Sequence, residues 1–299
     1  VGNGAAGTLV IEGGAVNVIN GTLTTGDSGN FKGQIIMTGG ALNITGANRD
    51  LNMDENPQGS NAAGSNILMS GGTISIADVL LVDHQASIDL SGGTITAAVE
   101  QPGAIRVRRN GQIRVTGGLL ETKDDLELGN ASIAGGSVII DGGIVRALRM
   151  AGVPGAGGFV QINQTGLLQV QNSQFSVAEA LNYIAAGHFT TVSSALQVGV
   201  VDVGGLDYTQ ISAVVALPGD FDQNGLVDGN DFLVWQRTTV SPAELQQWRD
   251  HYGQQLVLAA AGAVPEPHAG LLALLTAAPI GLTARRRRGA PRHRTSLEP

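Results

Sequence analysis

Oxygen-bearing side chains recur at short, regular intervals between residues 220 and 231. If Asp220 is position 1 of a loop, the next oxygen donors stand at positions 3, 5, 9 and 12, which are Asp222, Asn224, Asp228 and Asp231. Gly225 at position 6 permits a sharp turn, and Leu226 at position 7 offers its backbone carbonyl. Because Ca²⁺ takes six to eight hard oxygen ligands in a flexible shell, this spacing predicts a calcium site. The alternative is an acidic surface turn, since Asp, Asn and Gly also dominate turns.

The residues after the loop have the pattern of a helix, with Phe232, Leu233 and Trp235 as apolar contacts. Taken together, residues 219–237 resemble one repeat of a type I dockerin, in which Asp closes the loop. The resemblance implies Ca²⁺ as cofactor, held by the loop donors and the Leu226 carbonyl. A dockerin has a second loop that this chain lacks, and Gly229 and Asn230 stand where cohesin-binding dockerins often carry Ser or Thr. Both departures argue against cohesin as a partner.

A second specific motif lies near the C-terminus. Pro265, Glu266 and Pro267 precede a largely apolar segment, residues 269–284, which is followed by Arg285, Arg286, Arg287 and Arg288. An abrupt arginine cluster after an apolar segment indicates a membrane stop with the arginines on the cytoplasmic side. The three parts resemble a PEP-CTERM sorting signal, although residues 289–299 extend beyond its usual length. The resemblance implies a C-terminal transmembrane sorting helix, handled by an exosortase-type machinery that removes it after export.

The first 175 residues repeat one pattern, in which two alternating apolar segments flank a Gly-Gly pair. The first glycines of six copies are Gly13, Gly39, Gly71, Gly92, Gly117 and Gly135. A third strand signal usually lies between copies, as in residues 79–82 and 105–108, while residues 48–66 read as an inserted loop. Three strands per repeat predict a right-handed parallel β-helix, or solenoid, in a mainly β chain. A sandwich of hairpins is the alternative, because Gly-Gly also suits hairpin turns. The repeats resemble Gly-rich exported proteins of bacteria that use the PEP-CTERM signal.

Two capping boxes predict helices beyond the repeats. Ser176 and Glu179 open a helix with Leu181, Ile184 and Ala185 on its apolar face, and two strands follow near 196–203 and 208–216 as an end cap. Ser241 and Glu244 open another helix, whose Trp248 should face Trp235. The expected domains are therefore solenoid repeats (1–175), a small α/β cap (176–217), a dockerin-like module (218–253), a linker (254–264), the sorting signal (265–288) and a basic tail (289–299).

Composition limits the function classes. Net charge is −8 over 299 residues and there is no cysteine, which disfavours nucleic acid as a partner and excludes disulfides. Val1 starts the sequence without an export signal, so we expect either a start in mid-chain or a signal already removed.

A catalytic face on the solenoid would need ionisable groups that converge. The candidates are Asp50, Asp54 and Glu55, the pairs Asp83–His84 and Asp124–Asp125, and Arg106, Arg108, Arg109 and Arg114. Alternating Arg106 and Arg108 are expected to face solvent, and the acidic pairs to occupy corners. Few aromatic residues (4%) disfavour a sugar-cleaving groove. We therefore expect a non-catalytic exported protein, at the cell surface or in the extracellular matrix, with an exopolysaccharide or surface glycan as a candidate partner. The alternative is a secreted polysaccharide lyase or hydrolase, or a glycan-binding adhesin.

Overall fold

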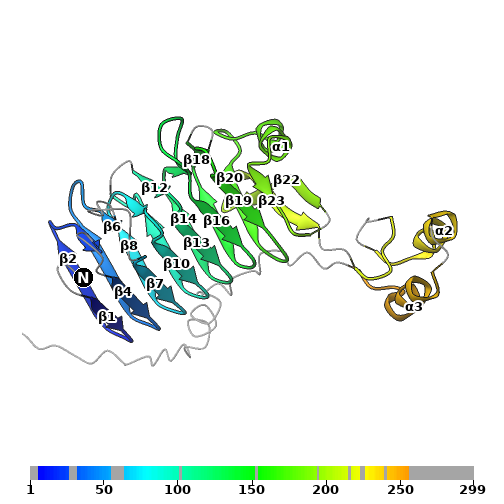
Figure 1. Cartoon of the computed structure of the whole chain (residues 1–299), viewed down its shortest axis with the longest axis horizontal. Coiled ribbons are helices and arrows are strands. Elements are labelled where there is room, and N and C mark those ends of the chain that lie inside the picture. The colour runs from blue at the N-terminus through cyan, green and yellow to red at the C-terminus, as the bar shows by residue number, and fades with distance from the viewer. Residues whose placement is uncertain are drawn as a thin grey trace, which may run out of the picture. The chain divides into compact units, whose positions relative to one another are not determined.

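The repeats form a parallel β-solenoid with three sheets. The computed structural model describes residues 6–26, 32–54, 64–100, 103–151, 154–193, 195–214, 217–222, 226–238 and 241–255. Each of the first six repeats contributes one strand to each sheet in turn, so within a sheet the strands of successive repeats lie side by side (Figure 1).

The first sheet has eight strands: β1 (Gly7–Ile11), β4 (Gly33–Met37), β7 (Asn66–Met69), β10 (Ser87–Leu90), β13 (Gln112–Val115), β16 (Ser137–Ile140), β19 (Phe159–Ile162) and β21 (Phe189–Thr190). The second has nine: β2 (Ala15–Ile19), β5 (Ala41–Thr45), β8 (Thr73–Ile76), β11 (Thr94–Ala97), β14 (Leu119–Thr122), β17 (Ile144–Ala147), β20 (Leu167–Gln171), β23 (Leu206–Val214) and β22 (Ala195–Val203). The third has six: β3 (Leu23–Thr25), β6 (Leu51–Met53), β9 (Leu80–Val82), β12 (Ala104–Val107), β15 (Asp125–Glu127) and β18 (Arg149–Met150).

Parallel pairing decides between the two predicted architectures. Strands of successive repeats pair in parallel and in register, for example Ile88 with Ile67 on one side and with Ile113 on the other. A sandwich of hairpins would require antiparallel neighbours within each repeat. The solenoid prediction is confirmed, and the third strand signals correspond to β9 and β12.

The core consists of in-register columns of branched apolar side chains. One column on the first sheet contains Ile35, Ile67, Ile88, Ile113, Val138 and Val160, all fully buried. Burial of each such side chain contributes about 1.5–3 kcal/mol. Since each residue stacks on its counterpart in the neighbouring repeat, stability accumulates along the solenoid.

The Gly-Gly pairs form the tight corner between the first and second sheets. At Gly118 φ is +74°, and an added Cβ would lie 2.4 Å from the carbonyl oxygen of Gly93 in the preceding repeat. The thioether ends of Met37 and Met69 fill the space beneath this corner, 2.7 Å and 2.8 Å from where the Cβ atoms of Gly72 and Gly93 would be. Glycine is required here because both the positive φ and the close approach exclude a side chain.

Two details of the predicted repeats are wrong. Gly135 and Gly136 do not form a Gly-Gly corner but precede β16, and the corner of that repeat is Gly142–Gly143. Residues 48–66 are not a simple insertion, because they contain β6, which pairs with β3 and β9 in the third sheet.

Helix α1 (Val177–Ala185) and the β22–β23 hairpin follow the repeats. The capping box at Ser176 and Glu179 is confirmed by hydrogen bonds in both directions, of 2.7 Å and 3.3 Å. The predicted apolar face is partly wrong, since Leu181 is 53% exposed and Ala180 is the buried residue of the helix. Strand β23 pairs antiparallel with β20, so the hairpin covers the last edge of the parallel second sheet.

Candidate metal centre

The predicted calcium loop leads into α2 (Gly229–Thr238), which packs near α3 (Pro242–His251). The loop begins where Gly219, at φ +92°, passes close to α3. An added Cβ on Gly219 would lie 2.6 Å from the Cα atom of Trp248, so only glycine fits at this point. The start of the loop is thereby fixed against the second helix.

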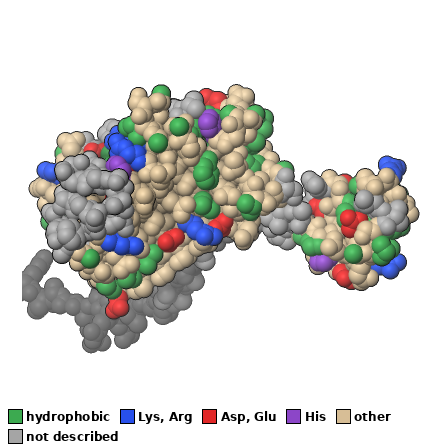
Figure 2. Space-filling model, viewed as in Figure 1, with side chains coloured by type: hydrophobic (Ala, Val, Ile, Leu, Met, Phe, Trp, Pro, Cys, Tyr) green, Lys and Arg blue, Asp and Glu red, His purple; other side chains and the backbone are tan. Residues whose placement is uncertain are grey.

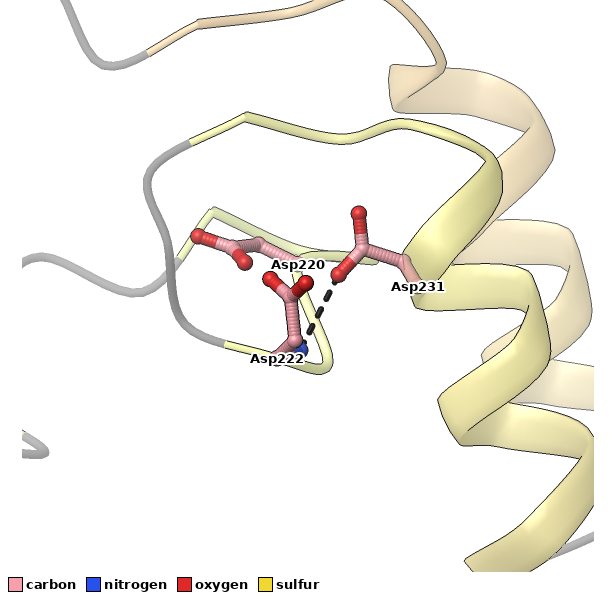
Figure 3. A group of neighbouring side chains, drawn as sticks. All are labelled: Asp220, Asp222 and Asp231. Atoms are coloured by element: carbon pink, nitrogen blue, oxygen red, sulfur yellow. Dashed lines mark hydrogen bonds between the residues drawn. The ribbon is translucent and has the colours of Figure 1, made fainter.

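Three carboxylates converge at the start of α2. Asp220, Asp222 and Asp231 each have an oxygen within 4.8 Å of the others (Figure 3). Asp231 is fully buried and Asp220 is 5% exposed, whereas Asp222 is exposed. Asp231 also joins the two ends of the loop, because its Oδ1 accepts a hydrogen bond from the Asp222 amide (3.0 Å) and its Oδ2 accepts one from the Asp228 amide (2.7 Å).

Like charges at this separation repel each other. A bound divalent cation would offset this repulsion, and carboxylate oxygens are ligands of hard cations. The donor set is therefore chemically suited to Ca²⁺.

The other predicted ligands are placed differently. The Asp228 carboxylate accepts a hydrogen bond from the Asn230 amide at the start of α2 (2.7 Å), and its backbone carbonyl accepts one from Trp248 Nε1 (2.7 Å). Leu226 forms a β-bridge with Gln255. Asn224 and Gly225 lie outside the described residues. Ligation by Asn224, Leu226 and Asp228 stays a prediction.

An aromatic cluster holds the two helices together. Phe232 stacks on Trp235 with ring centroids 5.5 Å apart and also contacts Trp248 at 5.0 Å, so a phenylalanine contacts both tryptophans that were expected to face each other. Tyr252 packs edge-on against Trp248 at 5.1 Å. The predicted capping box of α3 is wrong, because the Ser241 side chain makes no capping bond; its carbonyl instead accepts a hydrogen bond from Trp235 Nε1.

The candidate catalytic residues of the solenoid are mostly dispersed. Asp50 accepts a bond from the Val79 amide, Arg114 pairs with Asp141, and Asp124 and Asp125 both pair with Arg149. Glu55 lies outside the described residues.

Asp54, Asp83, His84 and Arg109 do come together, at the corner after the third sheet. The expectation that Arg106 and Arg108 simply face solvent is wrong, since both bind Glu127, at 3.1 Å and 2.6 Å. The sequence did not indicate Glu127 because its proximity depends on the pairing of β12 with β15.

Two shallow hollows lie on the surface of the described part of the chain. One of about 560 Å³ is lined by Gly155–Phe159, Gln161, His188 and Thr190 among others, and one of about 430 Å³ includes Lys123, Asp124 and Arg149. Neither contains the Asp83–His84 pair.

The predicted sorting signal, Pro265–Pro267 with residues 269–284 and Arg285–Arg288, lies outside the described residues. Within the described ranges, no helix is both long and apolar enough to cross a membrane. Comparisons with protein-family models, curated proteins and solved structures find no match to this chain.

Proposed function

We propose that this chain is a non-catalytic exported protein of the cell surface or extracellular matrix, stabilised by calcium and sorted through a PEP-CTERM-like signal. The observation that carries the calcium part is the convergence of Asp220, Asp222 and Asp231 within 4.8 Å. Asn224, Leu226 and Asp228 would complete the shell. The ion would supply charge neutralisation and cross-link the loop to α2.

The face of the solenoid seen in Figure 2 carries mainly uncharged side chains and backbone, with scattered charged groups, and this suits the role. Its coil is taken to be right-handed, since crossover connections between parallel strands of one sheet are right-handed in about 98% of cases. The module of α2 and α3 is taken as dockerin-like, without cohesin as partner.

The calcium part can be tested on the whole chain by tryptophan fluorescence. The chain has only two tryptophans, Trp235 and Trp248, and both lie in this module. Addition of millimolar Ca²⁺ should change their emission and raise the urea midpoint of that signal. At a free concentration of about 100 Kd, binding would add about 2.7 kcal/mol to the stability of the module.

Asp220→Asn and Asp231→Asn should abolish the response. The matched control is Asp250→Asn, which makes the same change at an exposed position of α3 whose carboxylate bonds only to Gln246 among the residues described. An unchanged emission and midpoint in the native protein, or an equal loss of response in Asp250→Asn, would disprove a calcium site in this loop.

The sorting part has a separate test. The intact mass of protein recovered from its native host should show loss of everything beyond about Pro265. Surface-displayed protein that retains Arg285–Arg288 would contradict it.

A further inference from the structure

The turns after the third sheet stack into one corner of the solenoid. Met53 and Val82 pair in register, as do Val82 and Val107, so the residues that follow them lie one above another. The amide of Asp83 donates to the Met53 carbonyl (3.1 Å), and the amide of Arg108 donates to the Val82 carbonyl (3.0 Å). We call the set Asp54, Asp83–Gln85 and Arg108–Asn110 the third corner.

Two turns of this corner hold bulky polar residues in a left-handed conformation. The turns Asp83–Ala86 and Arg108–Gly111 are closed by hydrogen bonds of 2.9 Å and 2.7 Å. Their central residues have positive φ: +41° and +69° at His84 and Gln85, and +44° and +69° at Arg109 and Asn110. Turns of this kind favour Asn-Gly, and each ordinary residue held at positive φ costs about 1–3 kcal/mol. Such strain concentrates at positions whose side chains have a use.

Beneath the turns lie buried carboxylates that fix the outer side chains. Asp83 accepts a hydrogen bond from Arg109 Nη1 (2.5 Å) and lies 3.2 Å from His84 Nδ1. The side chain of Asp83 is 2% exposed, against 28% for His84 and 40% for Arg109. The side chains of His84 and Arg109 are therefore accessible to solvent, whereas the Asp83 carboxylate that they contact is buried.

A second acidic residue, Asp54 of the preceding repeat, supports the imidazole through its backbone carbonyl. Its backbone carbonyl lies 3.1 Å from His84 Nδ1, and its carboxylate accepts hydrogen bonds from the Ser65 hydroxyl and amide. Burial raises the pKa of Asp54. Nδ1 of His84 is held by Asp54 and Asp83, while Nε2 has no partner among the described residues and the side chain is 28% exposed.

Two further arginines extend the cationic surface. Arg106 and Arg108 share one carboxylate, Glu127, and are 39% and 18% exposed. Three guanidinium groups therefore lie over two more deeply buried carboxylates, on a chain whose net charge is −8. Exposed amides of Gln85 and Asn110 stand beside them.

We propose that the third corner binds the carboxylate or sulfate groups of an acidic polysaccharide. Arg109, held by Asp83, presents donors to the anionic group, and charge-assisted bonds to a guanidinium are among the strongest available. The amides of Gln85 and Asn110 suit sugar hydroxyls, as does Nε2 of His84, which accepts a hydrogen bond when Nδ1 carries the proton. Single-stranded nucleic acid fits less well, because its bases stack on aromatic side chains and the third corner contains no Phe, Tyr or Trp. This binding requires neither calcium nor the sorting signal.

The test uses the full chain and titrates polygalacturonate, dextran sulfate, neutral dextran and single-stranded oligonucleotide by calorimetry at two salt concentrations. Either acidic glycan should bind, more weakly at high salt, and dextran should not. Arg109→Gln should weaken binding at least about tenfold, because a hydrogen bond to a charged group contributes about 1.5–3 kcal/mol. Arg114→Gln removes the same charge from an exposed side chain on β13 and should leave binding unchanged.

Arg109→Gln leaves Asp83 without its ion-pair partner and could unfold the corner, so a second variant separates binding from folding. The double change His84→Asn with Gln85→Gly installs the residues that the turn prefers. It should raise or preserve the urea midpoint and still weaken binding. Equal binding of dextran, tighter binding of the oligonucleotide, or full glycan binding by the double variant would each overturn the proposal.

Discussion

Gly118→Ala should destabilise the solenoid far more than the same change at Gly14, although both glycines occupy the second position of a Gly-Gly corner. Their φ angles are nearly equal, at +74° and +69°. A left-handed conformation costs an alanine about 1–2 kcal/mol at either position. The two sites differ in what a new methyl group would meet.

At Gly118 the added Cβ would lie 2.4 Å from the Gly93 carbonyl oxygen. The two atoms would have to move apart by about 1 Å to reach an ordinary van der Waals distance. That same oxygen accepts the hydrogen bond from the Leu119 amide at 3.0 Å. The methyl group therefore competes with a bond between repeats, and overpacking of this kind costs about 1–3 kcal/mol. The total for Gly118→Ala is about 2–5 kcal/mol. At Gly14 nothing lies within 4 Å of the added Cβ, so only the conformational term applies.

Far-ultraviolet circular dichroism in a urea titration measures the difference, because both tryptophans lie outside the repeats and their fluorescence does not report on the solenoid. The Gly118→Ala midpoint should fall well below that of Gly14→Ala, with similar slopes. Equal midpoints would refute the argument that close stacking of repeats, and not φ alone, requires glycine at this corner.

Two other changes probe the cap and the core. Hydrogen bonds from the Ser176 amide and hydroxyl lower the pKa of Glu179 below 4.5. The stability that Glu179 contributes is therefore fully present above pH 4.5 and is lost as the pH falls through the folded-state pKa of Glu179. Glu179→Gln should lower the urea midpoint at neutral pH, and the midpoint of the variant should decrease less on acidification than that of the native protein. An equal decrease in both proteins would contradict this. Leu120→Ala removes a fully buried side chain between Ile95 and Val145 and should lower the free energy of unfolding by about 2–5 kcal/mol. The control Val10→Ala changes an exposed side chain and should have little effect in the same urea titration.

The sequence correctly predicted the first five Gly-Gly corners, each of which lies between two alternating segments. The sixth prediction took Gly135–Gly136 for a corner and overlooked Gly142–Gly143, because the two pairs look alike in the sequence and only the pairing of β16 with β13 distinguishes them. Strand β6 was missed because three residues carry too little periodicity to separate a strand from a loop.

The two sites differ in how far the sequence could specify them. The Asp220–Asp231 spacing is local, so the three carboxylates that converge there were predicted by counting along the chain. Asp83 and Arg109 are 26 residues apart, and their contact depends on the lengths of the intervening turns and strands. Residue type and spacing alone therefore could not predict that Arg109 of one repeat contacts Asp83 of the preceding repeat.

The burial of the methionines beneath the Gly-Gly corners determines which sulfur atoms an oxidant can reach. The chain has no cysteine and four methionines, and Met37, Met53 and Met69 are at most 1% exposed. Sulfoxide formation would place a polar oxygen in a site already closed by Gly72 or Gly93. Met150, at the edge of the third sheet, is the only sulfur that solvent reaches appreciably. Peroxide should therefore oxidise Met150 first. Met37, Met53 and Met69 should stay reduced, and the packing of the repeats intact, because peroxide cannot reach their buried sulfur atoms.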